Sequence, residues 1–152
     1  MLSLMIKLFH NYKVRVNIVE QNKKQVHSAK SAMRWGEMDA LGHMNNVSYF
    51  RYFEESRISW FNSFPLNYNS EGDGPILGTI TCKFIKPAIY PVFFKVNTSI
   101  SRLGNSTFTM WTDICDDSDE TICFASAEAI MVWINIASGQ AVRVPNWFRR
   151  MF

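Results

Sequence analysis

One segment of the chain, residues 45–64, constrains the fold more than any other because it contains neither glycine nor proline. Asn45 or Asn46 can cap the start of a helix there, and Pro65 can end it. The polar residues fall on one narrow stripe, namely Ser48, Arg51, Glu55 and Asn62. Nearly all other positions are large and apolar, which predicts a helix about 30 Å long that is wet on one side and otherwise buried.

The sequence after this helix predicts mostly strands. A loop is expected over Ser63 to Pro75, which holds Pro, Asn, Ser and two Gly. Apolar and polar residues then alternate over 80–84, 92–100, 108–114 and 121–136, with turns at 103–106 and 116–120. Val142 and Val144 can pair briefly, and Pro145 can open a short terminal helix. One long helix followed by four or five antiparallel strands predicts an α+β domain whose sheet wraps the helix.

The N-terminal part of the chain is the least defined by its pattern. Tyr12 to Val19 alternates as a half-buried strand does, a turn follows, and His27 to Trp35 can return as a second strand. A chain of 152 residues suits one domain. We therefore expect an N-terminal extension over 1–25 that could carry a strand, and a single domain over 26–152.

Composition narrows the function classes. The net charge is +3 and the basic residues are scattered, which favours a phosphate-bearing ligand such as coenzyme A over nucleic acid. The three cysteines, Cys82, Cys115 and Cys123, contain no Cys-x-x-Cys pair, so neither a zinc site nor a disulfide framework is indicated and a cytoplasmic location is expected. The short apolar start does not resemble a signal peptide, and no apolar run is long enough to span a bilayer.

The chemistry concentrates in the residues just before the predicted helix. Asp39, Gly42 and His43 are followed by Asn45 and Asn46 at the helix start. The first N–H groups of a helix have no internal partner and carry the positive end of its dipole, so they can hold a polarised carbonyl oxygen. Asp39 is the acid positioned to act on such a group.

The run Arg34-Trp-Gly-Glu-Met-Asp-Ala-Leu-Gly-His-Met-Asn-Asn, followed by Tyr49, Tyr52, Glu54 and Arg57, resembles the hotdog-fold acyl-CoA thioesterases of the 4-hydroxybenzoyl-CoA thioesterase type. The resemblance implies a long central helix wrapped by a curved antiparallel sheet of five or six strands. It also implies a homodimer, often paired into a dimer of dimers, with active sites across the subunit interface. The expected reaction is hydrolysis of a thioester of coenzyme A, or of acyl carrier protein, without a metal or other cofactor.

The resemblance assigns roles to three residues. Asp39 matches the catalytic acid, as general base or nucleophile, and the amide N–H of Asn46 matches the group that holds the thioester oxygen. His43 could orient the acyl group, assist a proton transfer or be purely structural. Substrate contacts are expected from Gly42, Asn45, Tyr49, Lys83 and Arg102, with Lys86 as a further candidate for the coenzyme A phosphates.

Simpler roles remain open for several of these residues. Asp39 could only cap a turn, and the lysines and Arg102 could be solvated. Glu54 and Arg57 favour a structural ion pair, and Glu37 is expected to be solvated or paired with Arg34. Two other functions also remain open, because a fold does not fix a function. They are a hotdog dehydratase or hydratase and a non-catalytic acyl-thioester-binding protein.

Overall fold

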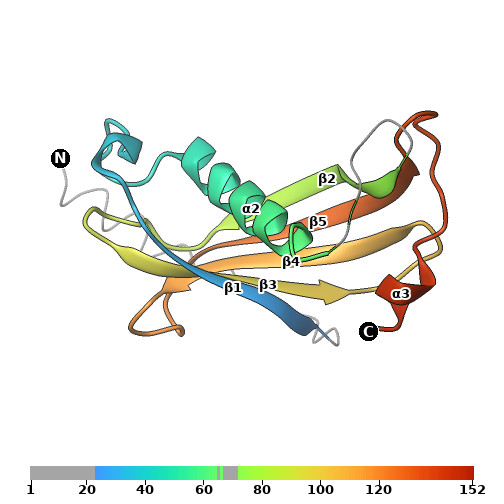
Figure 1. Ribbon diagram of the computed structural model, residues 1–152. Coiled ribbons are helices and arrows are strands. Elements are labelled where there is room, and N and C mark those ends of the chain that lie inside the picture. The colour runs from blue at the N-terminus through green and yellow to red at the C-terminus, as the bar shows by residue number, and fades with distance from the viewer. Residues whose placement is uncertain (1–22, 65, 67–71) are drawn as a thin grey trace.

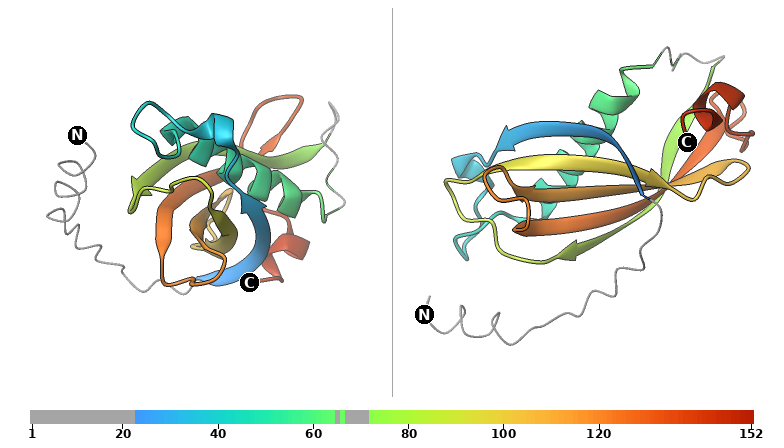
Figure 2. Two further views of the ribbon diagram at one scale, coloured as in Figure 1. Left: turned by 90° about the vertical axis from the view of Figure 1, so that its left-hand side faces the viewer. Right: turned by 90° about the horizontal axis from the view of Figure 1, so that it is seen from below.

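The computed structural model describes residues 23–64, 66 and 72–152, in which one long helix lies across a five-stranded sheet (Figure 1). The elements are β1 (Lys24–Ala32), the short 3-10 helix η1 (Trp35–Glu37), α2 (Asn46–Phe61), β2 (Asp73–Phe84), β3 (Phe93–Ser101), β4 (Thr107–Asp116), β5 (Cys123–Asn135) and α3 (Asn146–Arg149). All neighbouring strands are antiparallel, in the order β1-β3-β4-β5-β2. The sheet bends around α2, as Figure 2 shows, which confirms the predicted α+β architecture.

Helix α2 starts where the sequence predicts and ends earlier. The Asn45 side chain accepts a hydrogen bond from the N–H of Val47 at 2.9 Å, which caps the first turn. The helix ends at Phe61 rather than Phe64. There the hydroxyl of Ser63 donates to the carbonyl oxygen of Trp60 at 2.6 Å, so a side chain takes the carbonyl that the next helical turn would use.

The prediction that α2 is wet on one narrow stripe and otherwise buried is wrong. Ser48, from the predicted wet stripe, is buried, whereas Val47, Phe50 and Ile58 are exposed. These three residues lie on one face of the helix because successive residues are about 100° apart. The sheet covers only the opposite face, so an apolar stripe of α2 has no covering layer from the described part of the chain.

The expected ion pair on α2 also does not form. No oxygen of Glu54 lies within 4.0 Å of the Arg57 guanidinium, although Arg57 is buried and Glu54 is exposed. Burial lowers the pKa of Arg57, and the charge of Glu54 opposes that change. Arg57 is thus buried without a salt bridge to a carboxylate of the described residues.

The strands follow the predicted alternation, with one correction at β2. This strand starts at Asp73 and includes Gly74 and Pro75, both assigned to the loop by the sequence. Pro75 lies opposite Trp133 of β5. A proline is tolerated there because β2 is an edge strand whose second side needs no donor.

The core lies between α2 and the concave face of the sheet, in two groups of buried residues. The group around the first half of α2 includes Met44, Tyr49, Phe53, Phe94 and Ala127. The group around the second half and α3 includes Trp60, Phe61, Phe108, Trp133 and Phe148. Burying one such aromatic side chain contributes about 1.5 to 3 kcal/mol, so apolar burial holds both halves of α2 against the sheet.

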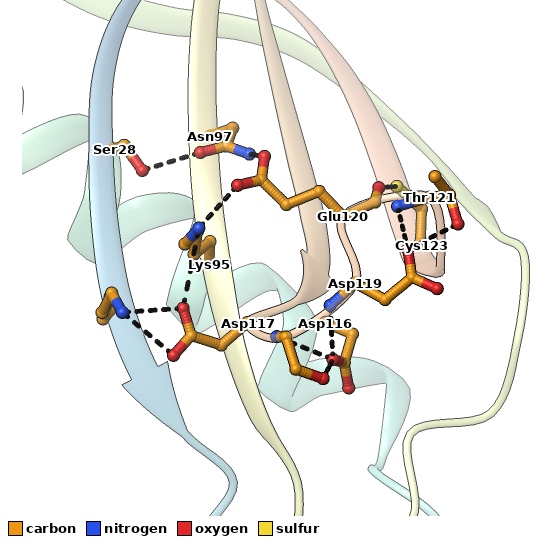
Figure 3. Close-up of polar contacts among 11 residues, drawn as sticks. Ser28, Lys95, Asn97, Asp116, Asp117, Asp119, Glu120, Thr121 and Cys123 are labelled. Atoms are coloured by element: carbon orange, nitrogen blue, oxygen red, sulfur yellow. Dashed lines mark hydrogen bonds and ion pairs between the residues drawn. The ribbon is translucent and has the colours of Figure 1, made fainter.

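The β4–β5 turn contradicts the prediction drawn from the cysteines. Cys115 and Cys123 form a disulfide, although their spacing of eight residues suggested none. A register shift after Ile114 places the two cysteines opposite each other across the hairpin, with Cα atoms 4.0 Å apart. Beside it, Glu120 accepts a hydrogen bond from Lys95 of β3 at 2.6 Å (Figure 3). Strand register, which the spacing does not reveal, brings the two thiols together.

At the N-terminal side the first described strand is shifted from its predicted place, whereas the C-terminal segment agrees with the prediction. The predicted strand Tyr12–Val19 lies outside the described residues, and the strand expected over His27–Trp35 is shifted to Lys24–Ala32. At the other end, Val142 donates to the carbonyl of Trp133 at 2.8 Å, as expected for a brief pairing. Helix α3 follows Pro145 directly, which confirms the short terminal helix.

Candidate active site

A cavity of about 230 Å³ opens where the turn before α2 meets the end of β2. Its lining consists of Asp39, His43, Met44, Asn46, Tyr49, Phe84, Ile85, Lys86 and Pro87. The polar residues come mainly from the turn and the helix start, and the apolar residues mainly from the first part of α2 and the segment after β2. The cavity therefore joins an acidic group, a helix N-terminus and an apolar wall.

The turn that carries Asp39 is held by its own backbone. Asp39 donates its N–H to the carbonyl of His43 at 2.9 Å and accepts the N–H of Gly42 at 3.0 Å. Met38 and Met44 pair across the turn as an isolated bridge. Gly42 has a φ of 82°, a conformation that glycine adopts without a steric penalty. This glycine shapes the turn and does not line the cavity.

The side chain of Asp39 has one oxygen engaged and the other near a histidine. Its Oδ1 accepts the N–H of Leu41 at 2.8 Å. Its Oδ2 lies 3.6 Å from Nδ1 of His43, which is longer than a hydrogen bond. Both side chains are about a quarter exposed, at 26% for Asp39 and 22% for His43. The carboxylate is thus fixed on one side and open to the cavity and the imidazole on the other.

The start of α2 presents a free amide to the same cavity. Asn45 uses its side chain to cap the N–H of Val47, and its own N–H donates to the carbonyl of Glu37 at 2.8 Å. The N–H of Asn46 has no acceptor among the residues that the structure describes. A helix N-terminus favours an oxygen with negative charge. Asn46 can therefore hold a carbonyl oxygen placed near Asp39.

Two aromatic rings form the apolar wall. Tyr49 and Phe84 pack edge to face with centroids 5.2 Å apart. The Tyr49 hydroxyl accepts the N–H of Ala88 at 3.3 Å, which ties α2 to the segment after β2. Burial raises the pKa of Tyr49, and Ala88 partly offsets this effect. Tyr49 therefore stays a neutral phenol at any pH near 7.

The segment that follows Phe84 is anchored to β5. The carbonyl oxygen of Phe124 accepts the N–H of Ile85 at 2.8 Å and that of Lys86 at 3.2 Å. These two bonds hold the chain after β2 against the sheet and place Lys86 in the cavity lining. Lys86 is the single lysine or arginine among the described residues of that lining, and only the tertiary structure selects it from the scattered basic residues.

The remaining predicted contacts do not meet at this cavity. Asn45 caps the helix, and Lys83 belongs to β2, where neighbouring residues alternate between faces of the sheet. Neither residue lines the cavity. Arg102 follows β3 at the far end of the sheet. A substrate contact of Gly42, Asn45, Lys83 or Arg102 stays a prediction that this cavity does not support.

Glu37 is neither free nor paired with the Arg34 guanidinium. Its Oε2 accepts the hydroxyl of Tyr52 at 2.6 Å and the backbone N–H of Arg34 at 2.8 Å. Burial, followed by this bond to Glu37, raises the pKa of Tyr52 well above its usual value. Glu37 thus holds η1 against α2 and does not line the cavity.

The described residues contain neither a cluster of metal ligands nor a membrane-spanning helix. In residues 23–64, 66 and 72–152, no three His, Cys, Asp or Glu side chains gather closely enough to hold a metal ion. Within the same part of the chain, no helix is long and apolar enough to cross a membrane.

Sequence comparison connects this arrangement with known proteins. Residues 33–152 match the family model of the thioesterase-like superfamily. A protein of Aquifex aeolicus (strain VF5) named "Putative esterase" is 30% identical over 113 residues, which are 72% of this chain and 84% of that protein. The match includes the turn with Asp39, α2 and all strands after it.

Two solved structures resemble the chain in fold and sequence. The PA2801 protein of Pseudomonas aeruginosa, described as a "putative Thioesterase", has a TM-score of 0.77 and 28% identity, covering 84% of this chain and 98% of that one. A protein of Xanthomonas campestris, described as a "putative acyl-CoA thioesterase", has a TM-score of 0.70 and 26% identity, covering 80% of this chain and 100% of that one. The similarity extends over nearly the whole of both structures.

Proposed function

Since the chain belongs to the thioesterase-like superfamily, we propose that it hydrolyses thioesters of coenzyme A to a free acid and a thiol. The observation that carries this proposal is the cavity that joins the Asp39 carboxylate to the unpartnered N–H of Asn46. Thioester hydrolysis needs an acid that delivers a nucleophile and a donor that stabilises the developing oxyanion. The name of the Xanthomonas campestris relative supports the acyl-CoA substrate.

The reaction begins with the carbonyl oxygen of the thioester against the N–H of Asn46. Asp39 then either removes a proton from an attacking water or attacks the carbonyl carbon itself. In both routes the carbon–sulfur bond breaks and coenzyme A leaves as its thiol. If Asp39 attacks, water then hydrolyses the resulting anhydride and restores the carboxylate.

The two routes differ in where an oxygen atom from water ends. Repeated turnover in H₂¹⁸O places ¹⁸O in the Asp39 carboxylate if Asp39 is the nucleophile and water attacks the Asp39 carbonyl carbon of the anhydride. Only the product acid carries the label if Asp39 is a general base. Mass spectrometry of the peptide that contains Asp39 therefore tests the nucleophilic route, which ¹⁸O in that peptide would establish.

The apolar wall and Lys86 extend the proposal to substrate contacts. Tyr49 and Phe84 offer ring surface to an acyl group, and the Lys86 ammonium lies in the same lining to meet an anionic part of the carrier. His43 lies on the opposite side of the Asp39 carboxylate from Leu41 and can assist the proton transfer. No other cofactor is needed for these steps.

The edge of the sheet supports a homodimer. β2 has no partner strand on its outer side among the described residues, and Ile76 and Phe84 on it are 45% and 50% exposed. The uncovered stripe of α2 with Val47, Phe50 and Ile58 adds apolar surface. An edge with exposed apolar residues is a template for pairing with another chain. We propose that two copies pair through β2, next to the cavity, and that two dimers can associate further.

A substrate panel tests the enzymatic proposal. Short-chain, long-chain and aromatic acyl-CoA esters are followed by thiol release, with the Asp39→Asn variant beside the native protein. We expect the variant to lose turnover by about 100-fold or more. Asp73→Asn is the matched control, because Asp73 is an exposed carboxylate outside the cavity.

The same panel decides against the alternatives. Undiminished turnover in Asp39→Asn would refute the role of Asp39. Binding of the esters without hydrolysis would indicate a non-catalytic acyl-thioester-binding protein. Hydration of an enoyl-CoA ester in place of hydrolysis would indicate a dehydratase or hydratase.

A further inference from the structure

At the end of the sheet away from the start of α2, β1 begins and β3 ends side by side (Figure 1). A second cavity lies there. Its volume is about 410 Å³. Lys23, Lys24, Ile100, Ser101, Arg102, Leu103 and Phe152 line it. Among the described residues, the lining therefore combines three cationic side chains with an apolar surface and includes no Asp or Glu side chain.

The two lysines are held by neutral groups. The Lys24 ammonium donates to the carbonyl oxygen of Met151 at 2.6 Å. The Lys23 ammonium lies 3.6 Å from the centroid of the Trp111 ring. Neither partner cancels the positive charge, although each limits where the ammonium can move. No carboxylate of the described residues lies within 4.0 Å of Lys23, Lys24 or Arg102.

A buried hydroxyl adds a neutral donor. Ser101 is 6% exposed and lines the cavity. Its oxygen accepts the indole N–H of Trp111 at 3.0 Å, and its own hydrogen has no acceptor among the described residues. A buried donor without an acceptor costs free energy of folding. An oxygen of a ligand could accept the hydrogen of the Ser101 hydroxyl and remove that cost.

The backbone at Arg102 has an unusual conformation. Arg102 has a φ of 46°, in the left-handed region that side-chain-bearing residues rarely adopt. Glycine would adopt this conformation without strain. Arg102 therefore holds this conformation at a cost to stability, and strained residues of this kind cluster at active sites and ligand-binding sites.

From these observations we propose that this cavity binds the phosphate monoester group of an organic anion, separately from the Asp39 site. A phosphate monoester carries a charge of about −1.5 to −2 near pH 7 and three acceptor oxygens. A phosphate monoester therefore suits three cations and the Ser101 hydroxyl better than a carboxylate does. A carboxylate carries only one negative charge. Ile100, Leu103 and Phe152 receive the apolar part of the ligand.

A further cation lies near this end of the sheet. The guanidinium of Arg149 in α3 donates to the carbonyl oxygens of Gly104 and Asn105, which follow Leu103 in the chain. Arg149 therefore adds positive charge beside the cavity.

The test uses phenyl phosphate as the probe and calorimetric titration as the measurement. Arg102→Gly removes the guanidinium and also the backbone strain. We expect this variant to bind phenyl phosphate at least about tenfold more weakly while its Tm stays equal to or above that of the native protein. A loss of affinity therefore cannot be attributed to unfolding. Arg143→Gln, an exposed arginine outside the cavity, should bind as the native protein does.

Further ligands and one further variant define the specificity. Benzoate should bind at least about tenfold more weakly than phenyl phosphate, because it carries a single charge. Coenzyme A should compete with phenyl phosphate more strongly than dephospho-coenzyme A if the monoester comes from coenzyme A, and equally if it comes from another organic phosphate. Asp39→Asn should leave the affinity for phenyl phosphate unchanged.

Three results would overturn the proposal. The first is the absence of phenyl phosphate binding to the native protein at millimolar concentration. The second is an equal loss of affinity in Arg102→Gly and Arg143→Gln, which would indicate nonspecific charge attraction. The third is a change in the affinity of Asp39→Asn for phenyl phosphate, above all a gain from the lost carboxylate charge, which would place the probe in the first cavity. None of these results depends on whether the protein hydrolyses thioesters.

Discussion

Asp39 and His43 face each other across a tight turn, with Oδ2 of the carboxylate 3.6 Å from Nδ1 of the imidazole. Because this separation exceeds a hydrogen bond, the imidazole is not required to hold the carboxylate in place. Leu41 performs that task through its N–H at 2.8 Å. The contribution of His43 to catalysis should therefore be smaller than that of Asp39.

His43→Asn should lower kcat/KM for the best acyl-CoA ester by about tenfold or less. Asp39→Asn should lower it by about 100-fold or more. The measurement is steady-state kinetics of both variants on the same substrate. Equal losses in the two variants would show that the imidazole is as essential as the carboxylate.

Gly42→Ala should destabilise the protein by about 1 to 2 kcal/mol, because a side chain at a left-handed position is strained. Its φ is 82°, although no atom would lie within 4 Å of an added Cβ. Gly36→Ala is the matched control, since Gly36 has the same open surroundings without a left-handed φ. Denaturant unfolding compares the two variants. Equal effects would contradict a backbone cause.

Asn45→Ala should cost about 1 kcal/mol of stability, because the N–H of Val47 loses its cap. Asn46→Ala should change turnover little, since the proposed oxygen contact uses the backbone N–H of Asn46, which alanine retains. Chemical denaturation and kinetics of the two variants check these outcomes. A large loss of turnover in Asn46→Ala at unchanged stability would assign a role to its side chain.

The disulfide should be visible in a thiol count. The unfolded native protein should show one reactive thiol, from Cys82, without a reductant and three after treatment with a dithiol. Reduction should also lower the free energy of unfolding by about 2 to 3 kcal/mol, as expected for a loop of this size. The double variant Cys115→Ser and Cys123→Ser should not respond to the reductant. Three thiols before reduction would show that the bond is absent.

Stability should fall with rising pH above about 10, where free tyrosine ionises. The pKa of Tyr52 is raised by burial and by its bond to Glu37, so the folded state retains a proton that the unfolded state loses. The contribution of Tyr52 is therefore complete below the ordinary tyrosine pKa and decreases above it. Denaturant unfolding at pH 8 and pH 11 should show a smaller decrease in Tyr52→Phe. An identical decrease would place the alkaline sensitivity elsewhere.

The dimer interface can be tested at the edge of the sheet. Ile76→Lys places a charge on the exposed β2 edge strand and should shift the protein toward monomer in sedimentation. Ser28→Lys is the control on β1, the other edge strand. A monomeric native protein, or equal dissociation by both variants, would contradict pairing through β2.

The sequence by itself determined the local elements of this protein. Absence of glycine and proline, with a capping asparagine, located α2, and strict alternation located β3, β4 and β5. The spacing from Asp39 to Asn46 also predicted that an acid would meet a helix N-terminus, because a short turn leaves few alternatives. These features depend on neighbours in the chain, which the sequence displays directly.

Two kinds of feature were decided only by the tertiary structure. They are those that depend on strand register and those that depend on which side of α2 the sheet covers. Register paired Cys115 with Cys123, and anchoring to Phe124 brought Lys86 rather than Lys83 to the cavity. The one-sided sheet left Val47 and Ile58 exposed on a helix expected to be buried almost all round. The physical reason is that each of these outcomes comes from contacts between segments distant in sequence, and apolar or basic residue types are compatible with several such contacts.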